Sequence, residues 1–537
     1  MIDLSIIDTS NILSPRKPAE PYSSGQVLPF RQSLLAMLGM CLVMMMVAID
    51  QTVVGTALPT IVAELRGFDL YAWVATSYLL ASVITVPIFG RLGDYYGRKP
   101  FVLAAIGLFT LASLLCGAAQ SMLGLAIARG LQGIGGGMLV GTGFACIPDL
   151  FPEPRVRLRW QIMFSSAFGI ANAVGPSLGG ILTEHYGWRS VFYVNLPIGL
   201  LGACFVILYL PRLRHQAQGK VRLDWPGALL IALALGALQL MVELLPRGGF
   251  SPALAGLGLA SAAAFAGLYY WERRCPQPLL PPAMFRNPAL STLFLLALLV
   301  GMVLFSLLFY VPLLLQGGFG MSPQQAGLLI TPLVVCITVG SIVNGRIITR
   351  IDRPNAMFYV GFALLSLACL AIVTLHAGTP HAWIAACMLV AGLGLGFVMP
   401  NLTVFAQQAA GRAQLGIATA MLQSLRMVGG MIGTAVVGTM VNHRYASGVA
   451  ATLQAGDAGQ WLSRLDDPQI LVDPQAHAQL LASAAQQGQN GALLIESARS
   501  ALVGAIHSGQ LVALAIAVLA LWCVRRLPPI RLAQVIK

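Results

Sequence analysis

Residues 90 to 100 read G-R-L-G-D-Y-Y-G-R-K-P and stand between two long apolar segments. Four of these residues are charged and costly to place in hydrocarbon, so the stretch predicts a turn at a membrane face. Gly90 and Gly97 would give its backbone unusual freedom. Three of the four charges are positive, which favours the cytoplasmic face. Any short inside loop collects Lys and Arg, so charge alone leaves open a connecting turn with no further role.

The composition is that of a polytopic membrane protein. Of 537 residues, 57% are hydrophobic and 9% are charged, whereas about a quarter of the residues of a soluble protein are charged. The nine cysteines show no paired spacing such as C-x-x-C, so neither a disulfide framework nor a metal site is predicted. The sequence also shows no cluster of nucleophile and base and no P-loop motif. We therefore predict neither an enzyme nor a cofactor.

Apolar runs of about 20 residues, each long enough to span the hydrocarbon core, recur along the chain. The fourteen predicted spans are 34–57, 72–90, 101–120, 123–147, 161–183, 191–210, 226–245, 252–271, 289–314, 323–345, 356–376, 382–406, 415–441 and 502–524. The first 33 residues include acidic side chains and no unbroken apolar run, so we expect a cytoplasmic tail and no cleavable signal peptide.

Basic residues are distributed as this topology requires. With the N-terminus inside, 24 of the 32 Lys and Arg residues lie on the cytoplasmic side and six lie outside, which is a strong positive-inside signal. Seven of the eight tryptophans lie at span ends, as in an interfacial belt. The net charge of +13 is therefore explained by topology, and no nucleic-acid partner is expected. Both termini are predicted to be cytoplasmic.

The charged stretch occurs twice in the chain. G-R-I-I-T-R-I-D-R-P from Gly345 aligns with it without gaps and matches it at one Gly and two Arg positions. If the chain consists of two six-helix halves with a helix pair inserted between them, both copies follow the second helix of a half. Parallel repeats of this kind are typical of transporters whose substrate binds between two rocking halves. The predicted organisation is a tail at 1–33, a six-helix bundle at 34–210, a linker with two inserted helices at 211–288, a six-helix bundle at 289–524 that includes the outer loop 442–500, and a tail at 525–537.

Three more motifs lie in predicted helices. They are D-Q-T-V-V-G-T-A-L-P-T-I from Asp50, R-G-L-Q-G-I-G-G-G from Arg129 and G-P-S-L-G-G from Gly175. Together with the stretch at residue 90, they resemble the motifs of drug/proton antiporters of the major facilitator superfamily. Tyr95 and Ala171 depart from the family pattern in ways that concern local packing.

Other stretches are similar to those of the fourteen-helix branch of these antiporters. They are W-R-S-V-F-Y-V-N-L-P-I-G from Trp188, L-D-W-P-G from Leu223 and Q-G-G-F-G-M-S-P-Q-Q-A-G-L from Gln316. The resemblance covers the chain from Asp50 to about Gly433.

The resemblance implies an all-α membrane protein with the major facilitator fold, made of two six-helix bundles plus two inserted helices. It implies a multi-pass transporter of the cell inner membrane that exports drugs or other small amphipathic compounds in exchange for protons. A narrow-specificity exporter of an endogenous metabolite or siderophore is the alternative. The resemblance assigns a gating loop on the cytoplasmic side to Gly90, Asp94, Gly97, Arg98 and Lys99. It assigns the sealing of the outer end of the transport path to Gly175, Pro176, Gly179 and Gly180.

Asp50 and Arg129 are charged residues inside predicted helices and are predicted to meet. Asp50 lies eight residues before Leu58, at the outer end of its helix, and Arg129 six residues inside the outer start of its own, about 12 and 9 Å at 1.5 Å per residue. If the two helices are neighbours, the side chains form an ion pair. A buried carboxylate beside an arginine switches between holding and releasing a proton as the pair opens and closes. A static pair that only locks the two helices together is the alternative.

Polar residues at inner positions of other helices are candidates for a substrate cavity. Arg426 has no obvious acidic partner in the sequence, and backbone carbonyls or Gln423, three residues earlier, are its expected contacts. The predicted cavity residues are Gln51, Gln132, Asn172, Asn401, Gln423 and Arg426.

The segment 442–500 between the last two spans is predicted to lie outside. It is rich in Ala and Gln, and its part from Gln475 onward has a helix-forming composition. Three roles stay open for it: a cap over the outer vestibule, a docking surface for a periplasmic adaptor that leads to an outer-membrane channel, or a flexible linker. The other expected partners are a small-molecule substrate, protons and the lipid bilayer.

Overall fold

The structure is a computed structural model. It describes residues 30–151, 154–211, 224–248, 251–276, 278–280, 282–348, 351, 353–410, 415–455, 461, 465, 468–471, 474–487 and 489–528. All described elements are helical, because a chain this apolar has to pair its backbone N–H and C=O groups internally in a bilayer.

The first part of the chain forms one group of helices. They are α1 (Phe30–Leu65), the short η1 (Phe68–Leu70), α2 (Tyr71–Tyr96), α3 (Arg98–Gly117), α4 (Met122–Leu150), α5 (Pro154–Tyr186), α6 (Ser190–Tyr193) and α7 (Asn195–Tyr209). Helix α4 packs against α2 and α3, while α1 packs against α5 and α7.

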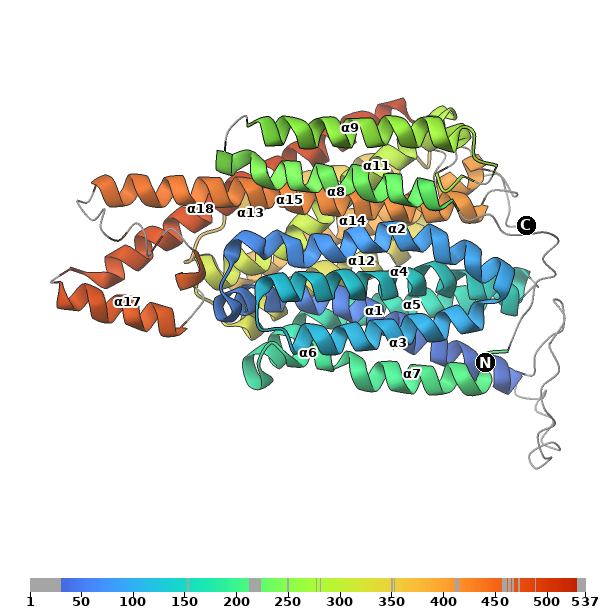
Figure 1. Cartoon of the computed structure of the whole chain (residues 1–537), viewed down its shortest axis with the longest axis horizontal. Coiled ribbons are helices and arrows are strands. Elements are labelled where there is room, and N and C mark those ends of the chain that lie inside the picture. Colours follow the sequence, from blue (N-terminus) through green and yellow to red (C-terminus); the bar gives the residue numbers. More distant parts are fainter. Residues whose placement is uncertain are drawn as a thin grey trace.

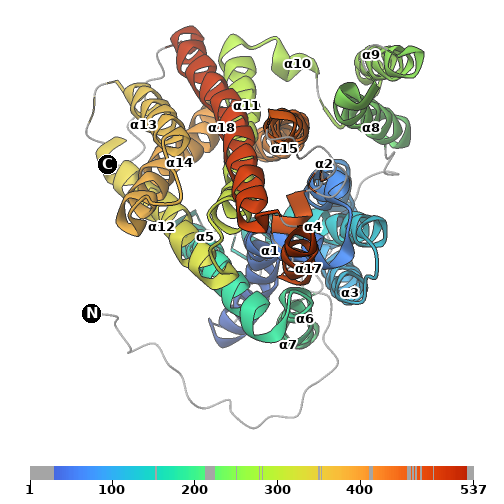
Figure 2. The ribbon, with the colours of Figure 1, turned by 90° about the vertical axis from the view of Figure 1, so that its left-hand side faces the viewer.

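The second part of the chain continues with α8 (Trp225–Gly248) and α9 (Pro252–Glu272), which pack on each other. The other helices are α10 (Pro282–Phe285), α11 (Pro288–Leu313), η2 (Leu314–Gly318), α12 (Pro323–Ile348), α13 (Ala356–Val373), α14 (His381–Ala410), α15 (Leu415–Ala455), η5 (Pro468–Leu471), α17 (Pro474–Gln486), α18 (Gly491–Cys523) and η6 (Val524–Arg526). Figure 2 shows α8 and α9 beside the bundle, where α8 contacts α2 and α15.

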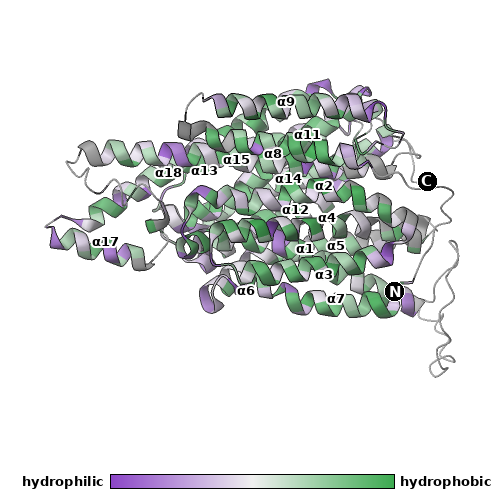
Figure 3. Ribbon diagram, viewed as in Figure 1, coloured by the Kyte–Doolittle hydropathy of each residue, from purple (hydrophilic) through white to green (hydrophobic). Residues whose placement is uncertain are grey.

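The long helices run roughly along the longest axis of the molecule (Figure 1), and most of their length is hydrophobic (Figure 3). Helix α1 begins and α18 ends toward one end of this bundle, which we call the terminal end, and α17 lies at the other, which we call the α17 end. Among the described residues, twelve helices are long and apolar enough to cross a membrane. They overlap twelve of the fourteen predicted spans. The remaining two, 161–183 and 226–245, fall in α5 and α8, which are helices but are not among the twelve.

The stretch at residue 90 is not the ten-residue loop that we expected. Helix α2 continues to Tyr96 and α3 begins at Arg98, so Gly97 alone separates them. Gly97 has φ 87°, a conformation that costs glycine little and other residues more. Gly90 therefore lies in α2, whereas Arg98 and Lys99 begin α3. The side chain of Asp94 lies outside the described part of the structure.

The segment 442–500 contains packed helices, so its described part is not a flexible linker. Helix α15 runs on without a break to Ala455, and α17 packs against α18. Trp461 and Leu465 are buried, and the Tyr445 hydroxyl donates a hydrogen bond to the Leu465 carbonyl oxygen at 2.8 Å. The short helix η5 contacts both α1 and η2. The described part of this segment therefore lies over the α17 end of the bundle.

The two groups of helices meet through α1 with α11, α2 with α15 and α5 with α12. Several hydrogen bonds join them close to the α17 end. The Tyr71 hydroxyl donates to the Phe309 carbonyl at 2.7 Å, and the Gln316 amide donates to the Thr56 carbonyl at 2.7 Å. The bundle is thus tied together at the α17 end.

Candidate functional site

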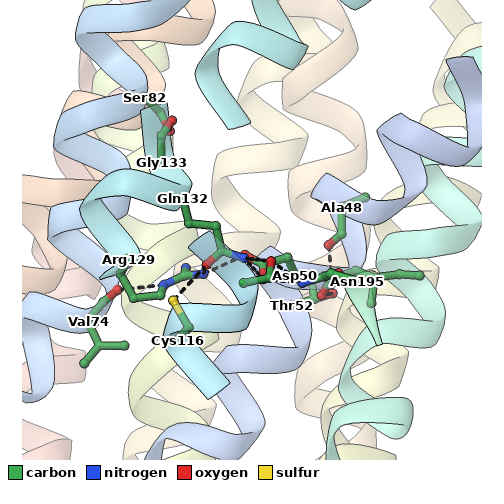
Figure 4. Close-up of polar contacts among 12 residues, drawn as sticks. Ala48, Asp50, Thr52, Val74, Ser82, Cys116, Arg129, Gln132, Gly133 and Asn195 are labelled. Carbon is green, nitrogen blue, oxygen red and sulfur yellow. Dashed lines mark hydrogen bonds and ion pairs between the residues drawn. The ribbon is translucent and has the colours of Figure 1, made fainter. Parts of the chain in front are cut away.

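Asp50 lies within α1 and is completely buried. Three side chains from two other helices donate to its carboxylate (Figure 4). The Arg129 Nη1 atom of α4 lies 2.6 Å from Asp50 Oδ2, while Gln132 Nε2 of α4 and Asn195 Nδ2 of α7 lie 2.7 and 3.0 Å from Oδ1. The predicted contact of Asp50 and Arg129 is therefore present in the structure. Both oxygens of the carboxylate accept hydrogen bonds, as burial of a charge requires.

Arg129 is fixed by contacts beyond the carboxylate. Its Nε donates to the Val74 carbonyl of α2 at 3.1 Å, and its Nη1 also donates to Gln132 Oε1 at 2.7 Å. Its guanidinium lies over the ring of Tyr78 of α2, 4.5 Å from the centroid. The arginine is 1% exposed, so the ion pair is closed off from solvent in this conformation.

Helix α4 reaches this position because its glycine-rich motif packs closely on α2. A Cβ atom at Gly133 would lie 2.3 Å from the Tyr78 carbonyl oxygen, so only glycine fits there. Close backbone approach through small residues is a common way for membrane helices to pack. The motif from Arg129 therefore supplies both the cation and the surface that places it.

Two members of the network were not among the predicted site residues. Asn195 donates to Ser113 Oγ of α3 at 3.2 Å as well as to Asp50, and Gln132 Nε2 donates to the same hydroxyl at 2.7 Å. Ser113 and Asn195 are fully buried. A lone Asn at the start of an otherwise apolar helix was the available signal for Asn195, whereas a buried serine in an apolar helix gives none.

This network, which we call the Asp50 network, consists of Asp50, Ser113, Arg129, Gln132 and Asn195. It holds one carboxylate and one guanidinium, whose charges cancel, and three neutral polar side chains. The neutral donors can hydrogen-bond the carboxyl group of Asp50 in its charged or its protonated form. If α1 and α4 moved apart, a proton could therefore replace Arg129 as the partner of the carboxylate. Among the described residues, no group of His, Cys, Asp and Glu is arranged to hold a metal ion.

The residues of the G-P-S-L-G-G motif lie between α1 and α12. Gly175 and Gly179 face Thr52 and Val53 of α1. On the opposite side, a Cβ atom at Gly180 would lie 2.4 Å from the Pro323 carbonyl oxygen of α12.

The contact of α5 with α12 continues on both sides of this crossing. A Cβ atom at Gly327 would lie 2.3 Å from the Pro176 carbonyl oxygen. The hydroxyls of Ser177 and Thr331 are hydrogen-bonded at 2.5 Å, and the Gln324 backbone N–H donates to Glu184 at 3.0 Å. The two helices are therefore in close contact at the α17 end.

The predicted cavity residues differ in burial and in their hydrogen-bond partners. Gln132 belongs to the Asp50 network, and Asn401 is buried with its amide paired to that of Asn344 by two hydrogen bonds of 2.8 and 3.0 Å. The side chain of Asn172 donates within its own helix to Phe168, at 2.9 Å. The residues that are partly exposed are Gln51, Asn172, Gln423 and Arg426.

The predicted gating residues next to Gly97 make structural contacts. Lys99 Nζ donates to the carbonyl oxygens of Ile207 and Leu210, both at 2.7 Å, at the end of α7 where helical carbonyls lack partners. Arg98 is buried. A role of this stretch in gating stays a prediction.

Comparison with known proteins shows relatives along most of the chain. The pattern that defines the Major Facilitator Superfamily matches residues 40–434. Multidrug resistance protein 3 of Bacillus subtilis is 33% identical over 458 residues, which cover 82% of this chain and 87% of that protein. The methylenomycin A resistance protein of Streptomyces coelicolor is 30% identical over 444 residues, which cover 82% of this chain and 92% of that protein.

Solved structures share the fold at low sequence identity. A bacterial homologue of the human lysosomal transporter Spinster, in an inward-facing and unoccupied conformation, has a TM-score of 0.65 and 14% identity. The match covers 93% of this chain and 98% of that one.

Proposed function

Because this chain belongs to the Major Facilitator Superfamily and is a membrane transporter, we propose that it exports drugs or other small amphipathic compounds in exchange for protons. Relatives at about 30% identity are named for multidrug or antibiotic resistance, which supports export as the direction of transport. We further propose that it has fourteen spans, with α5 and α8 completing the twelve. The α17 end then faces the periplasm, and both termini lie in the cytoplasm.

The Asp50 network is the observation that carries the proton coupling. A fully buried carboxylate in a membrane helix is expensive and calls for a task or a permanent partner. Here its partner Arg129 sits on another helix, so a relative movement of α1 and α4 would break the ion pair and leave the carboxylate to take up a proton. The neutral donors Gln132 and Asn195 keep the site polar in either state.

The contacts at the α17 end support an exchange cycle. Helices α5 and α12 touch there through glycine, and hydrogen bonds join α1 with η2 and α2 with α11. With this end closed, substrate would enter from the cytoplasm. Opening it toward the periplasm would require α5 and α12 to separate, which makes the G-P-S-L-G-G motif part of the outer seal. An adaptor and an outer-membrane channel stay predicted partners.

Growth-inhibition tests in an efflux-deficient bacterial host examine the export function. Expression of the wild-type chain should raise the inhibitory concentration of several structurally unrelated amphipathic compounds, and Asp50→Asn should abolish the effect at equal expression. Protection against a single compound would instead favour the narrow-specificity exporter of a metabolite or siderophore. Protection against none would contradict drug export.

A further inference from the structure

Arg426 is an intramembrane cation, and the long helices α11 to α15 of its own half contain no acidic residue. Between Glu272 and Asp457 the sequence holds one acidic residue, Asp352, which follows α12 at the terminal end. Helices α11 to α15 therefore carry no Asp or Glu. In α18 the only acid is Glu496, close to the α17 end, whereas Arg426 lies eleven residues from the start of α15 at the terminal end.

The Asp50 network cannot neutralise Arg426 either. The carboxylate of Asp50 is paired with Arg129 and accepts two further hydrogen bonds from Gln132 and Asn195. No hydrogen bond, ion pair or ring contact joins the Arg426 side chain to any residue that the structure describes. The positive charge of Arg426 is thus uncompensated within the described protein.

The position of Arg426 on α15 turns it toward the protein interior. The next positions on the same helical face, four and eleven residues on, are Gly430, which packs on Phe305 of α11, and Val437, which packs on Gly509 of α18. The backbone of Arg426 itself packs on Gly301 of α11. Both Gly430 and Val437 are buried, whereas Arg426 on the same face is partly exposed.

A polar neighbour lies on the same side of the helix. Gln423, one turn before Arg426, is also partly exposed, and no hydrogen bond of its side chain to a described residue is present. The guanidinium has a fixed fork of N–H donors that suits the two oxygens of a carboxylate. The carboxamide of Gln423, one turn away, offers a further N–H donor to the same anion.

We propose that Arg426, together with Gln423, binds the anionic group of the exported compound, so that the preferred substrates are amphipathic organic acids with one carboxylate. An unpaired charge in a membrane protein is costly, and a ligand that carries the counter-charge removes this cost on binding. The inference rests on the proposed export function and names the substrate class. It also predicts discrimination against uncharged analogues, since these would leave the arginine unpaired.

Binding of two matched fluorescent probes tests the proposal. Dansyl-phenylalanine carries a carboxylate, and its primary amide has nearly the same size and shape but no charge. We expect the purified wild-type protein to bind the acid more tightly than the amide, and Arg426→Gln to weaken acid binding by about 10- to 100-fold with little effect on the amide. Arg426→Lys keeps the positive charge but loses the planar fork of donors, so it should retain only part of the preference. Arg444→Gln, which removes a charge from the same helix near the α17 end, is the matched control and should change neither affinity.

Thermal unfolding separates this site from a structural arginine. Because the proposal leaves Arg426 unpaired in the free protein, Arg426→Gln should melt at the same temperature as wild type or higher. A lower melting temperature of Arg426→Gln would overturn the proposal. So would an equal loss of affinity for both probes in this variant, or a wild-type protein that does not bind the acid more tightly than the amide. Acid-selective binding without protection in the growth tests would leave the anion site standing and remove the export function. Protection in the growth tests without acid-selective binding would support the export function and contradict the anion site.

Discussion

Asp50 takes its partners from α4 and α7, two helices that are distant in the sequence. Arg129 binds one carboxylate oxygen, and Gln132 and Asn195 both bind the other, so removal of one partner leaves a buried charge less fully paired. The side chain of Asn195 bridges Asp50 and Ser113 and is the only link from α7 to the carboxylate among the described contacts. Asn195 is therefore a positioning residue that holds α1 and α7 together around the charge.

Replacing Asn195 with Ala should destabilise the protein by about 1.5–3 kcal/mol, the usual contribution of a hydrogen bond to a charged group. The check is thermal unfolding of the purified protein, with Asn172→Ala as the control, because Asn172 is partly exposed and bonds only to its own helix among the described residues. Equal melting temperatures for the two variants would show that the contact with Asp50 contributes nothing.

The sequence predicts the ion pair of Asp50 and Arg129 but not the whole Asp50 network. Matching depths in two neighbouring helices predicted the contact of Asp50 with Arg129 correctly. Helical periodicity does not show which other helices pack beside α1 and α4, so Asn195 of α7 and Ser113 of α3 were not predicted. Gln132 was predicted to line a substrate cavity, whereas it is buried in the Asp50 network.

The crossing of helices α5 and α12 depends on glycines, which have no side chain. Pairs of glycines let the two backbones touch, and the polar contacts around them are few and short. This motif was found in the sequence through its resemblance to a motif of known antiporters. Its partner helix was not predicted, because the pairing of helices from different halves has no local signal in the sequence. The stretch at residue 90 was likewise predicted as a loop because of its charges and glycines, whereas α2 continues to Tyr96.

Replacing Gly327 with Ala should push α12 away from α5, since the new methyl group would meet the Pro176 carbonyl at 2.3 Å. Overpacking of this kind costs about 1–3 kcal/mol, here against the conformation closed at the α17 end. We expect faster labelling of a single cysteine placed near that end of α5, in a background without native cysteines. Gly345→Ala on the same helix is the control, because a Cβ atom there meets nothing within 4 Å. Unchanged labelling in Gly327→Ala would remove the α5–α12 contact from the seal.

The described part of the segment 442–500 contacts both halves at the α17 end. It extends α15 and α18 beyond the bundle and brings η5 against α1 and η2. The sequence predicted helix from Gln475 onward, but it could not predict the docking of this segment, which rests on a few buried side chains such as Trp461. A cap in this position would have to move when the α17 end opens.

The packing of α17 on α18 should weaken in acid. Burial, and then the nearby positive charge of Arg499, lower the pKa of His477 from its ordinary value of 6.5. The neutral form is therefore favoured in the folded segment, and stability is lost as pH falls through 6.5, where the unpacked segment takes up a proton more readily. Hydrogen exchange of residues 474–486, corrected for its intrinsic pH dependence, should lose protection between pH 7.5 and 5.5. His477→Gln should abolish this change, and an undiminished pH dependence in that variant would assign it to another group.

We propose that Asp50 couples export to protons, and this coupling can be measured as transport in inverted membrane vesicles. An imposed pH gradient should drive accumulation of a fluorescent drug in vesicles that carry the wild-type protein or Glu64→Gln. The latter removes an exposed carboxylate from the same helix, where it pairs with Arg189. Asp50→Asn keeps the size of the side chain and removes its titration, so the same gradient should drive no accumulation although the drug still binds. Gradient-driven accumulation by the Asp50→Asn protein at the wild-type rate would contradict the account.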